Sequence, residues 1–330
     1  EFSASETGML AYRSGSGDDK RELVWMDRTG KKLGEASKPA ALVGAFSLSP
    51  DEKTVAVRIG ASPQTDLWIQ DLGRDVLSRF TFRAGVVGGT VVWSLDGSRL
   101  VFAFQDASTY SSDIYQKATA GNGKEELLLH GSVNATPLDW SSDEKWIVYS
   151  QTGEKTAIDL WLLPSPNGTP GAQKPIPYLQ TPFNERNGRF SPDGRWMAYV
   201  SDESGGTQVY IQAVPPSGAK WQISTSGAST TVGFGPAWRR DAKELYYVSA
   251  DQKVMAVLIQ LGSTSVEPST PHALFSLLGS TSYFPTRGGQ RFLVNAPAGG
   301  ASAAVPPVTV VTNWQGCWRT NSGTFSSAIP

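Results

Sequence analysis

A Ser-Pro-Asp-Gly turn between two apolar strands recurs along the chain, and this repetition restricts the fold more than any other feature. In its complete form at Ser191–Gly194, proline presets φ, aspartate tolerates the next turn position, and glycine supplies the left-handed residue that closes a bulged hairpin. The flanking segments 189–190 and 196–200 are rich in aromatic and β-branched residues, as strands are. The stretch therefore predicts a strand, a turn and a second strand.

Degraded copies of this turn follow other apolar runs at a nearly constant spacing. From aspartate to aspartate the intervals are 45, 47, 50 and 48 residues. The aspartates that mark the turns, and that we expect to cap their own hairpins, are Asp51, Asp96, Asp143, Asp193 and Asp241. One further step forward reaches Gly288–Gly289, and one step back reaches Ser5–Gly8. The chain is therefore expected to hold seven copies.

A second landmark begins a third strand in successive copies, as in Asp66–Trp68, Asp113–Tyr115 and Asp159–Trp161. A Gly-rich turn and a short fourth strand follow, for example Glu126–Leu129. Four antiparallel strands in about 45 residues are typical of one blade of a β-propeller. A single blade cannot bury both of its faces, so several blades must pack together. The predicted fold class is all-β: one seven-bladed β-propeller of four-stranded antiparallel blades over residues 1–314. The expected blades are 1–43, 44–86, 87–133, 134–183, 184–231, 232–279 and 280–314.

The two ends of the chain lack complete blades. The last blade shows strands at Arg291–Asn295 and Val308–Trp314 but no clear fourth strand, and the first has only a stub before Ser5. Two ways of closing the ring remain open at this point. Either residues upstream of Glu1 supply the missing strand, or the tail Gln315–Pro330 folds back to fill the gap.

The composition and charge of the chain exclude some classes of binding partner. Hydrophobic residues make up 39% and charged residues 18% of the chain, which suits a folded globular protein. The net charge is −1 and no basic run exists, so we expect neither nucleic acid nor a membrane surface as a partner of this monomer. The single cysteine, Cys317, excludes an intramolecular disulfide and a cysteine-based zinc cluster. No apolar run approaches the roughly 20 residues of a membrane helix.

Few residues suggest catalysis. A Ser-His-Asp triad needs a histidine, and the only two, His130 and His272, fall at variable places in the repeat. Gly-x-Ser-x-Gly never occurs intact. We therefore predict no catalytic residue, no metal and no cofactor. Carboxylates such as Asp139 and Glu185 keep a hydrolase open as the alternative, because paired carboxylates can act as acid and base.

Binding residues are expected in the loops that join each outer strand to the next inner strand, around one mouth of the axial channel. The richest loop is Asn184–Arg189, since arginine forks bind carboxylates and phosphates. The candidate ligand-binding residues are Asn184, Glu185, Arg186, Arg189, Asp139, Arg83, Asn134 and Arg239. The competing structural interpretation pairs Glu185 with Arg186 or with a neighbouring blade.

The combination of Ser-Pro-Asp-Gly, an Ala-Tyr strand and Asp-Leu-Trp is similar to TolB-like, WD-like propeller repeats. More closely, the chain resembles the C-terminal propeller attached to bacterial serine/threonine protein kinases of the acidobacterial type. The matching segments are Phe2–Tyr12, Leu23–Gly30, Arg79–Phe82, Tyr115–Leu129, Pro182–Val200, Lys220–Thr225, Ala237–Tyr247 and Arg291–Thr312. Kinase motifs themselves are absent from this chain.

This resemblance implies a function by association. It implies an extracytoplasmic, periplasmic fragment of a membrane-anchored signalling protein, with its targeting segment elsewhere. We therefore expect a non-catalytic sensor or docking module that binds a small molecule or a protein at the channel mouth. The alternative is an esterase, a glycosidase or a peptidase-associated hydrolase with its site at the same mouth.

Overall fold

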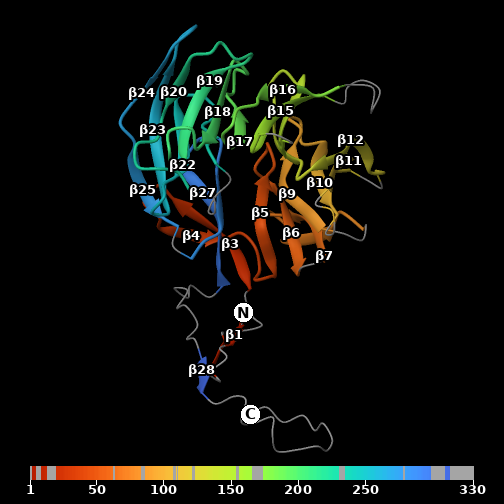
Figure 1. Ribbon diagram of the computed structural model, residues 1–330. Coiled ribbons are helices and arrows are strands. Elements are labelled where there is room, and N and C mark those ends of the chain that lie inside the picture. Colours follow the sequence, from red (N-terminus) through yellow and green to blue (C-terminus); the bar gives the residue numbers. More distant parts are fainter. Residues whose placement is uncertain are drawn as a thin grey trace, which may run out of the picture.

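The computed structural model describes residues 2–4, 9–12, 20–61, 64–82, 86–106, 109, 111–120, 123–153, 156–165, 174–229, 235–277, 279–298 and 309–312. These residues form antiparallel sheets that stand around a common axis (Figure 1). Among the residues described, no helix is long and apolar enough to cross a membrane.

Four complete blades follow one another along the chain, and in each the strands pair in sequence order from the axis outward. Blade 1 consists of β5 (Leu42–Leu48), β6 (Thr54–Ala61), β7 (Gln64–Asp71) and β8 (Val76–Arg79). Blade 2 consists of β9 (Val86–Trp93), β10 (Arg99–Gln105), β11 (Ser111–Ala118) and β12 (Glu126–Val133). Blade 3 consists of β13 (Thr136–Trp140), β14 (Trp146–Thr152), β15 (Ile158–Pro164) and β16 (Ile176–Leu179). Blade 4 consists of β17 (Glu185–Phe190), β18 (Trp196–Ser201), β19 (Gln208–Ala213) and β20 (Lys220–Gln222).

Blade 5 departs slightly from this plan. Its strands are β21 (Ala237–Trp238), β22 (Glu244–Val248), β23 (Lys253–Leu261) and β25 (His272–Ser276). The far end of the long β23 also pairs with β24 (Val266–Pro268). The blade therefore keeps four main strands and carries one extra strand at its outer corner.

Blade 6 is built from both ends of the chain. Its inner strands are β26 (Ser282–Pro285) and β27 (Arg291–Pro297), and its outer strands are β3 (Arg21–Asp27) and β4 (Lys32–Glu35). The pairing of β27 with β3 is regular from Arg291 opposite Asp27 to Pro297 opposite Arg21. The inner strands β5, β9, β13, β17 and β21 contact one another in succession, and β26 contacts β5. The ring is thus closed by strands from the start of the chain.

The predicted seven blades are wrong, because the structure has six. Residues 21–35 of the expected first blade and residues 282–297 of the expected last blade are the two halves of a single blade. Ser5–Gly8, which the spacing counted as a separate copy, precedes the strands β3 and β4 that complete this blade, so the count gave one blade too many. In the described residues the outer half of the closing blade is supplied by β3 and β4, which lie downstream of Glu1. The tail 315–330 is outside the described residues, so its predicted closing strand stays a prediction.

The first predicted strand pair does not belong to a blade. Strands β1 (Phe2–Ala4) and β2 (Met9–Tyr12) form a separate three-stranded sheet with β28 (Thr309–Thr312). In this sheet β2 lies between β1 and β28, and Figure 1 shows β1 and β28 apart from the ring. Segments near the two ends of the chain are therefore paired a second time outside the propeller.

The turns between the first and second strands of the blades behave as predicted. In blade 4 the Ser191 hydroxyl donates to Asp193 and accepts the backbone N–H of Trp196. Each marked aspartate accepts the backbone N–H two residues later. These bonds close the hairpin locally, so the structural role predicted for the five turn aspartates is confirmed.

Apolar cores fill the spaces between adjacent blades. One such cluster joins Val101 and Ile114 of blade 2 to Ile147 and Tyr149 of blade 3, and all four are almost fully buried. Tryptophan N–H groups add cross-blade hydrogen bonds, since Trp93 Nε1 donates to the Ser47 carbonyl at 3.0 Å. Each blade is therefore covered on both faces by its neighbours.

Candidate functional site

The axial channel contains a cavity of about 280 Å³ that opens on the face formed by the turns between first and second strands. All six inner strands, β5, β9, β13, β17, β21 and β26, contribute to its wall. We name this end of the propeller the turn face. A concave site lined by every blade at once is the position where a ring of sheets holds a small ligand.

The repeat places one equivalent side chain per blade at the mouth of this cavity. It is the second residue of the turn, which is proline in the complete Ser-Pro-Asp-Gly form. The six members of this mouth ring, in blade order, are Pro50, Leu95, Ser142, Pro192, Arg240 and Arg287. Polarity is therefore unevenly distributed around the mouth. Blades 1 and 2 contribute two apolar residues, and the adjacent blades 5 and 6 contribute two arginines.

A second ring lies deeper in the cavity. Its members stand two residues before the turn in each inner strand. This inner ring, in blade order, consists of Ser47, Val92, Asp139, Arg189, Ala237 and Phe284. Indole rings of Trp93, Trp140 and Trp238 also line the cavity. Its wall therefore combines aromatic surface with one acidic and one basic side chain.

Asp139 and Arg189 lie on neighbouring inner strands and interact electrostatically. The backbone N–H of Phe190 donates to Asp139 Oδ2 at 2.8 Å. Burial raises the pKa of the Asp139 carboxyl, opposed by the charge of Arg189 and by the Phe190 hydrogen bond. Burial lowers the pKa of Arg189, and Asp139 opposes that shift. The pair places a carboxyl group with a raised pKa on the channel wall.

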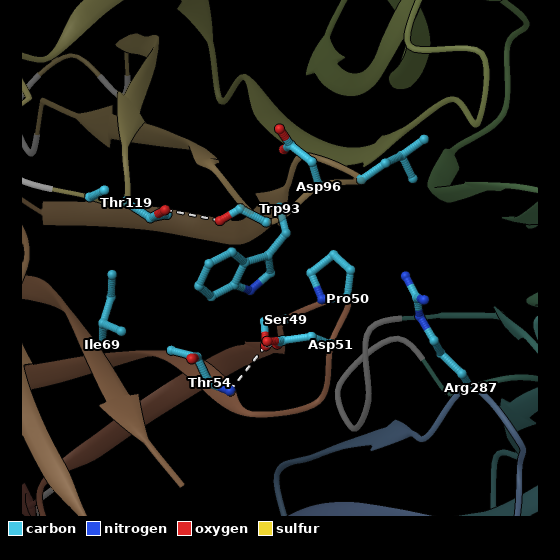
Figure 2. A pocket seen from close by; sticks show the side chains of 12 residues that line it. Ser49, Pro50, Asp51, Thr54, Ile69, Trp93, Asp96, Thr119 and Arg287 are labelled. Carbon is cyan, nitrogen blue, oxygen red and sulfur yellow. Dashed lines mark hydrogen bonds between the residues drawn. The ribbon is translucent and has the colours of Figure 1, made fainter. Parts of the chain in front are cut away.

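A side groove extends the mouth between blades 1 and 2. Its volume is about 430 Å³, and it shares Pro50, Trp93 and Arg287 with the channel. Figure 2 shows the Trp93 indole at the centre of the groove, with Pro50 between it and Arg287. At the other end the groove reaches Ile69 and Thr119. A ligand at the mouth can therefore extend sideways past Trp93, along a wall that mixes apolar residues with polar ones such as Asp51 and Asp96.

The predicted binding residues do not form one site. Asp139 and Arg189 line the channel cavity. Asn184, Glu185 and Arg186 lie at or next to the opposite end of β17, and Asn134 lies next to the opposite end of β13, away from the turn face. Arg83 is outside the described residues. The loops between blades, where the sequence predicted binding, thus lie at one end of the inner strands. The channel cavity lies at the other end.

The loop at the start of β17 is occupied by its own contacts. Asn184 donates to Asp202 through its backbone and side-chain nitrogens, at 2.9 and 2.7 Å. Arg186 donates to Asn184 Oδ1 at 2.9 Å. Asn134 likewise bridges Gln105 to Thr152. Asn184, Arg186 and Asn134 are therefore held by hydrogen bonds within the protein. This is closer to a structural role than to an open anion site.

Glu185 is buried beside other acidic groups. It is 1% exposed, and Thr181 Oγ1 donates to its Oε1 at 2.6 Å. Burial raises the pKa of Glu185 to about 7, and the charges of Asp159 and Glu203 add to the rise. Glu185 is not among the residues that line the channel cavity.

Arg239 makes ion pairs within blade 5. Its guanidinium contacts Asp241 at 2.7 Å and Glu244 at 2.9 Å. The hydrogen bonds that Arg239 donates to Asp241 are the main cause of the raised pKa of Arg239. The next residue, Arg240, is the one that faces the channel mouth.

Histidine and metal chemistry find no support in the part of the chain that the structure describes. His130 is an exposed side chain whose Nδ1 lies 2.8 Å from Asp113 Oδ1, and His272 is exposed on β25. Within the described residues no group of three or more His, Cys, Asp or Glu side chains could hold a metal ion.

The sequence reasoning missed most of the channel residues. It treated the turn as a structural landmark and did not follow its second position, where the mouth ring lies. Aligning the six turns on their first residue would have found Arg240 and Arg287 as the two charged members of that ring.

The sequence matches no family model and no curated protein, but solved structures share its architecture. A protein assigned as TolB from Agrobacterium tumefaciens aligns with a TM-score of 0.62 at 18% identity, over 84% of this chain and 98% of that one. The periplasmic gluconolactonase of Pseudomonas aeruginosa aligns at 0.57 and 16%, over 87% and 88%.

An oligogalacturonate lyase from Vibrio parahaemolyticus aligns at a TM-score of 0.51 and 12% identity, over 90% of this chain and 97% of that one. These three proteins have different names and activities, and their identities to this chain are low. The likeness therefore concerns the architecture alone. The chain has a TolB-like β-propeller fold.

Proposed function

We propose that this chain is a non-catalytic ligand-binding module whose ligand occupies the axial channel at the turn face. The observation that carries the proposal is the channel cavity, because both rings of equivalent residues converge on it. Ligand pockets are concave and mostly apolar, with few polar groups that fix orientation. The tryptophan-rich wall and the Asp139–Arg189 pair match that description.

The biological setting is part of the same proposal. The resemblance of the repeats to kinase-attached propellers supports a sensory module of a larger bacterial signalling protein. The fold shared with TolB and with a periplasmic gluconolactonase supports a place outside the cytoplasm. The module acts as a monomer, because a closed ring leaves no blade that needs another chain to complete it.

Filling the channel tests the binding proposal. Ala237 is a half-buried member of the inner ring, so Ala237→Phe adds an aromatic ring to the cavity. We expect wild-type protein, dialysed against a small-molecule extract of a bacterium, to retain at least one compound that Ala237→Phe loses. Mass spectrometry of the released compounds is the readout.

The matched control for this experiment is Ser78→Phe, which places the same ring on an exposed outer strand of blade 1. It should retain the same compounds as the wild type. If Ala237→Phe and the wild type retain identical compounds, the channel is not the binding site.

The alternative function, a hydrolase, is favoured by one observation. Asp139 combines a raised pKa with a position on the channel wall, and such a carboxyl can act as a general acid. In that case compounds from the extract would be converted to products of new mass, and Asp139→Asn would abolish the conversion. On the binding proposal, the retained compounds keep their mass in both proteins.

A further inference from the structure

We infer that the channel ligand carries a carboxylate, which Arg240 and Arg287 hold at the mouth while its apolar body lies against the aromatic wall. This inference rests on the proposed function and adds the chemical class of the ligand. It starts from the mouth ring, where neighbouring blades present the two arginines to one cavity.

The backbone holds the two arginines close together. The backbone N–H of Arg240 donates to the carbonyl of Arg287 at 3.1 Å, which joins the two turns directly. Arg240 is exposed and Arg287 is half-buried. Burial lowers the pKa of Arg287, and the neighbouring charge of Arg240 adds to that effect. Two like charges are therefore kept side by side at a partly desolvated mouth.

Neither guanidinium makes a hydrogen bond or an ion pair with the residues that the structure describes. This separates them from Arg28 and Arg239, which are bound to Glu244. A guanidinium presents a planar fork of donors that fits a carboxylate. Two adjacent forks without a partner are suited to one shared anionic group.

The acidic residues near the mouth are already engaged. Asp51 accepts from Ser49 and from the backbone of Lys53. Glu52 accepts the backbone N–H of Arg287 at 2.6 Å and lies 3.9 Å from the Arg291 guanidinium. The charges of Glu52 and Asp51 oppose the lowering of the pKa of Arg287, but they leave its fork of donors open.

The neighbouring part of the mouth accounts for the apolar part of the ligand. Pro50 of blade 1 lies next to Arg287 around the ring, and Leu95 of blade 2 follows it. Trp93 continues the apolar surface into the side groove. An anion without an apolar body would use only half of this surface. A protein side chain would reach the arginines but leave the deeper cavity empty, so a small amphipathic acid fits the site better.

Two probes of equal shape test the inference by titration calorimetry: 4-phenylbutyrate, which is an anion, and 4-phenylbutanamide, which is neutral. We expect wild-type protein to bind the acid about tenfold or more tightly than the amide. Arg240→Gln and Arg287→Gln should each weaken binding of the acid about tenfold and leave the amide unchanged. Higher salt should weaken only the acid.

The control Arg74→Gln removes an exposed arginine from the β7–β8 turn, outside the channel, and should bind both probes as the wild type does. Equal affinity of the wild type for acid and amide, unchanged binding of the acid by both channel variants, or no binding of the acid would each overturn the inference. The extract experiment with Ala237→Phe tests whether the channel binds a ligand at all, and its outcome does not depend on these titrations. The two proposals can therefore fail separately.

Discussion

Deletion of residues 1–37 is expected to abolish cooperative folding of the propeller. It removes β3 and β4, the outer half of blade 6, and with them the ladder that joins β27 to β3. Leu23 and Val24 are 0% and 2% exposed, and loss of one buried aliphatic side chain costs about 2–5 kcal/mol. Removing both, together with a strand ladder, approaches the whole stability of a typical domain, about 5–15 kcal/mol.

The expected observation is loss of the near-ultraviolet circular dichroism of the tryptophans and of a sharp thermal transition. A shorter deletion, residues 1–19, is the control. It removes β1 and β2, which pair with β28 outside the ring, and it should keep the transition. If both deletions melt alike, the β3–β27 ladder does not close the ring.

The fold was largely predictable from the sequence because its signal is local. The Ser191–Asp193 hydrogen bond is made within one turn, so the residues of the turn report the hairpin directly. The number of blades is not local information. Residues 21–35 and 282–297 each hold two strands, and only the long-range pairing of β3 with β27 shows that they make one blade.

Part of the candidate site could also be predicted from the sequence. Asp139 was chosen because it stands on an inner strand just before Trp140, and Arg189 because it belongs to the charge-rich loop Asn184–Arg189; both line the channel. Glu185 and Arg186 were chosen because their loop is rich in charge. Charge in a loop does not reveal whether the groups are satisfied, and here Thr181 and Asn184 satisfy them in part. Which end of an inner strand faces the cavity depends on how the blades pack.

Replacement of Glu244 by glutamine is expected to destabilise the protein by about 3 kcal/mol, because removing one partner of a buried ion pair leaves the others uncompensated. Glu244 is 2% exposed. It receives hydrogen bonds from Arg28 at 2.7 and 3.1 Å, from Arg239 at 2.9 Å and from the Tyr246 hydroxyl at 2.7 Å. Urea unfolding at pH 7 measures the loss.

The matched control is Glu267→Gln, the same substitution at an exposed residue of β24 in the same blade. Exposed substitutions usually change stability by less than about 0.5 kcal/mol. Equal unfolding midpoints for the two variants would contradict a structural role for Glu244.

The pH dependence gives an independent check of the same network. Burial by itself raises the pKa of Glu244, but the hydrogen bonds from Arg28 and Tyr246 outweigh it, so the pKa lies below the ordinary value of 4.5. A carboxyl with a lowered folded-state pKa contributes stability that is present above its unfolded pKa and is lost as the pH falls through the folded one. The stability difference between wild type and Glu244→Gln should therefore shrink below about pH 4.5.

This network also bears on closure of the ring. Arg28 belongs to the turn between β3 and β4, and it donates to the carbonyl of Gly289 in blade 6 at 2.9 Å as well as to Glu244 in blade 5. The N-terminal strands are thus held by the β27 ladder and by a charged clamp to the preceding blade. If the clamp contributes to closure, combining Glu244→Gln with Leu23→Ala should destabilise the protein by more than the sum of the single changes, because both weaken the attachment of one segment. A strictly additive result would assign Glu244 to blade 5 alone.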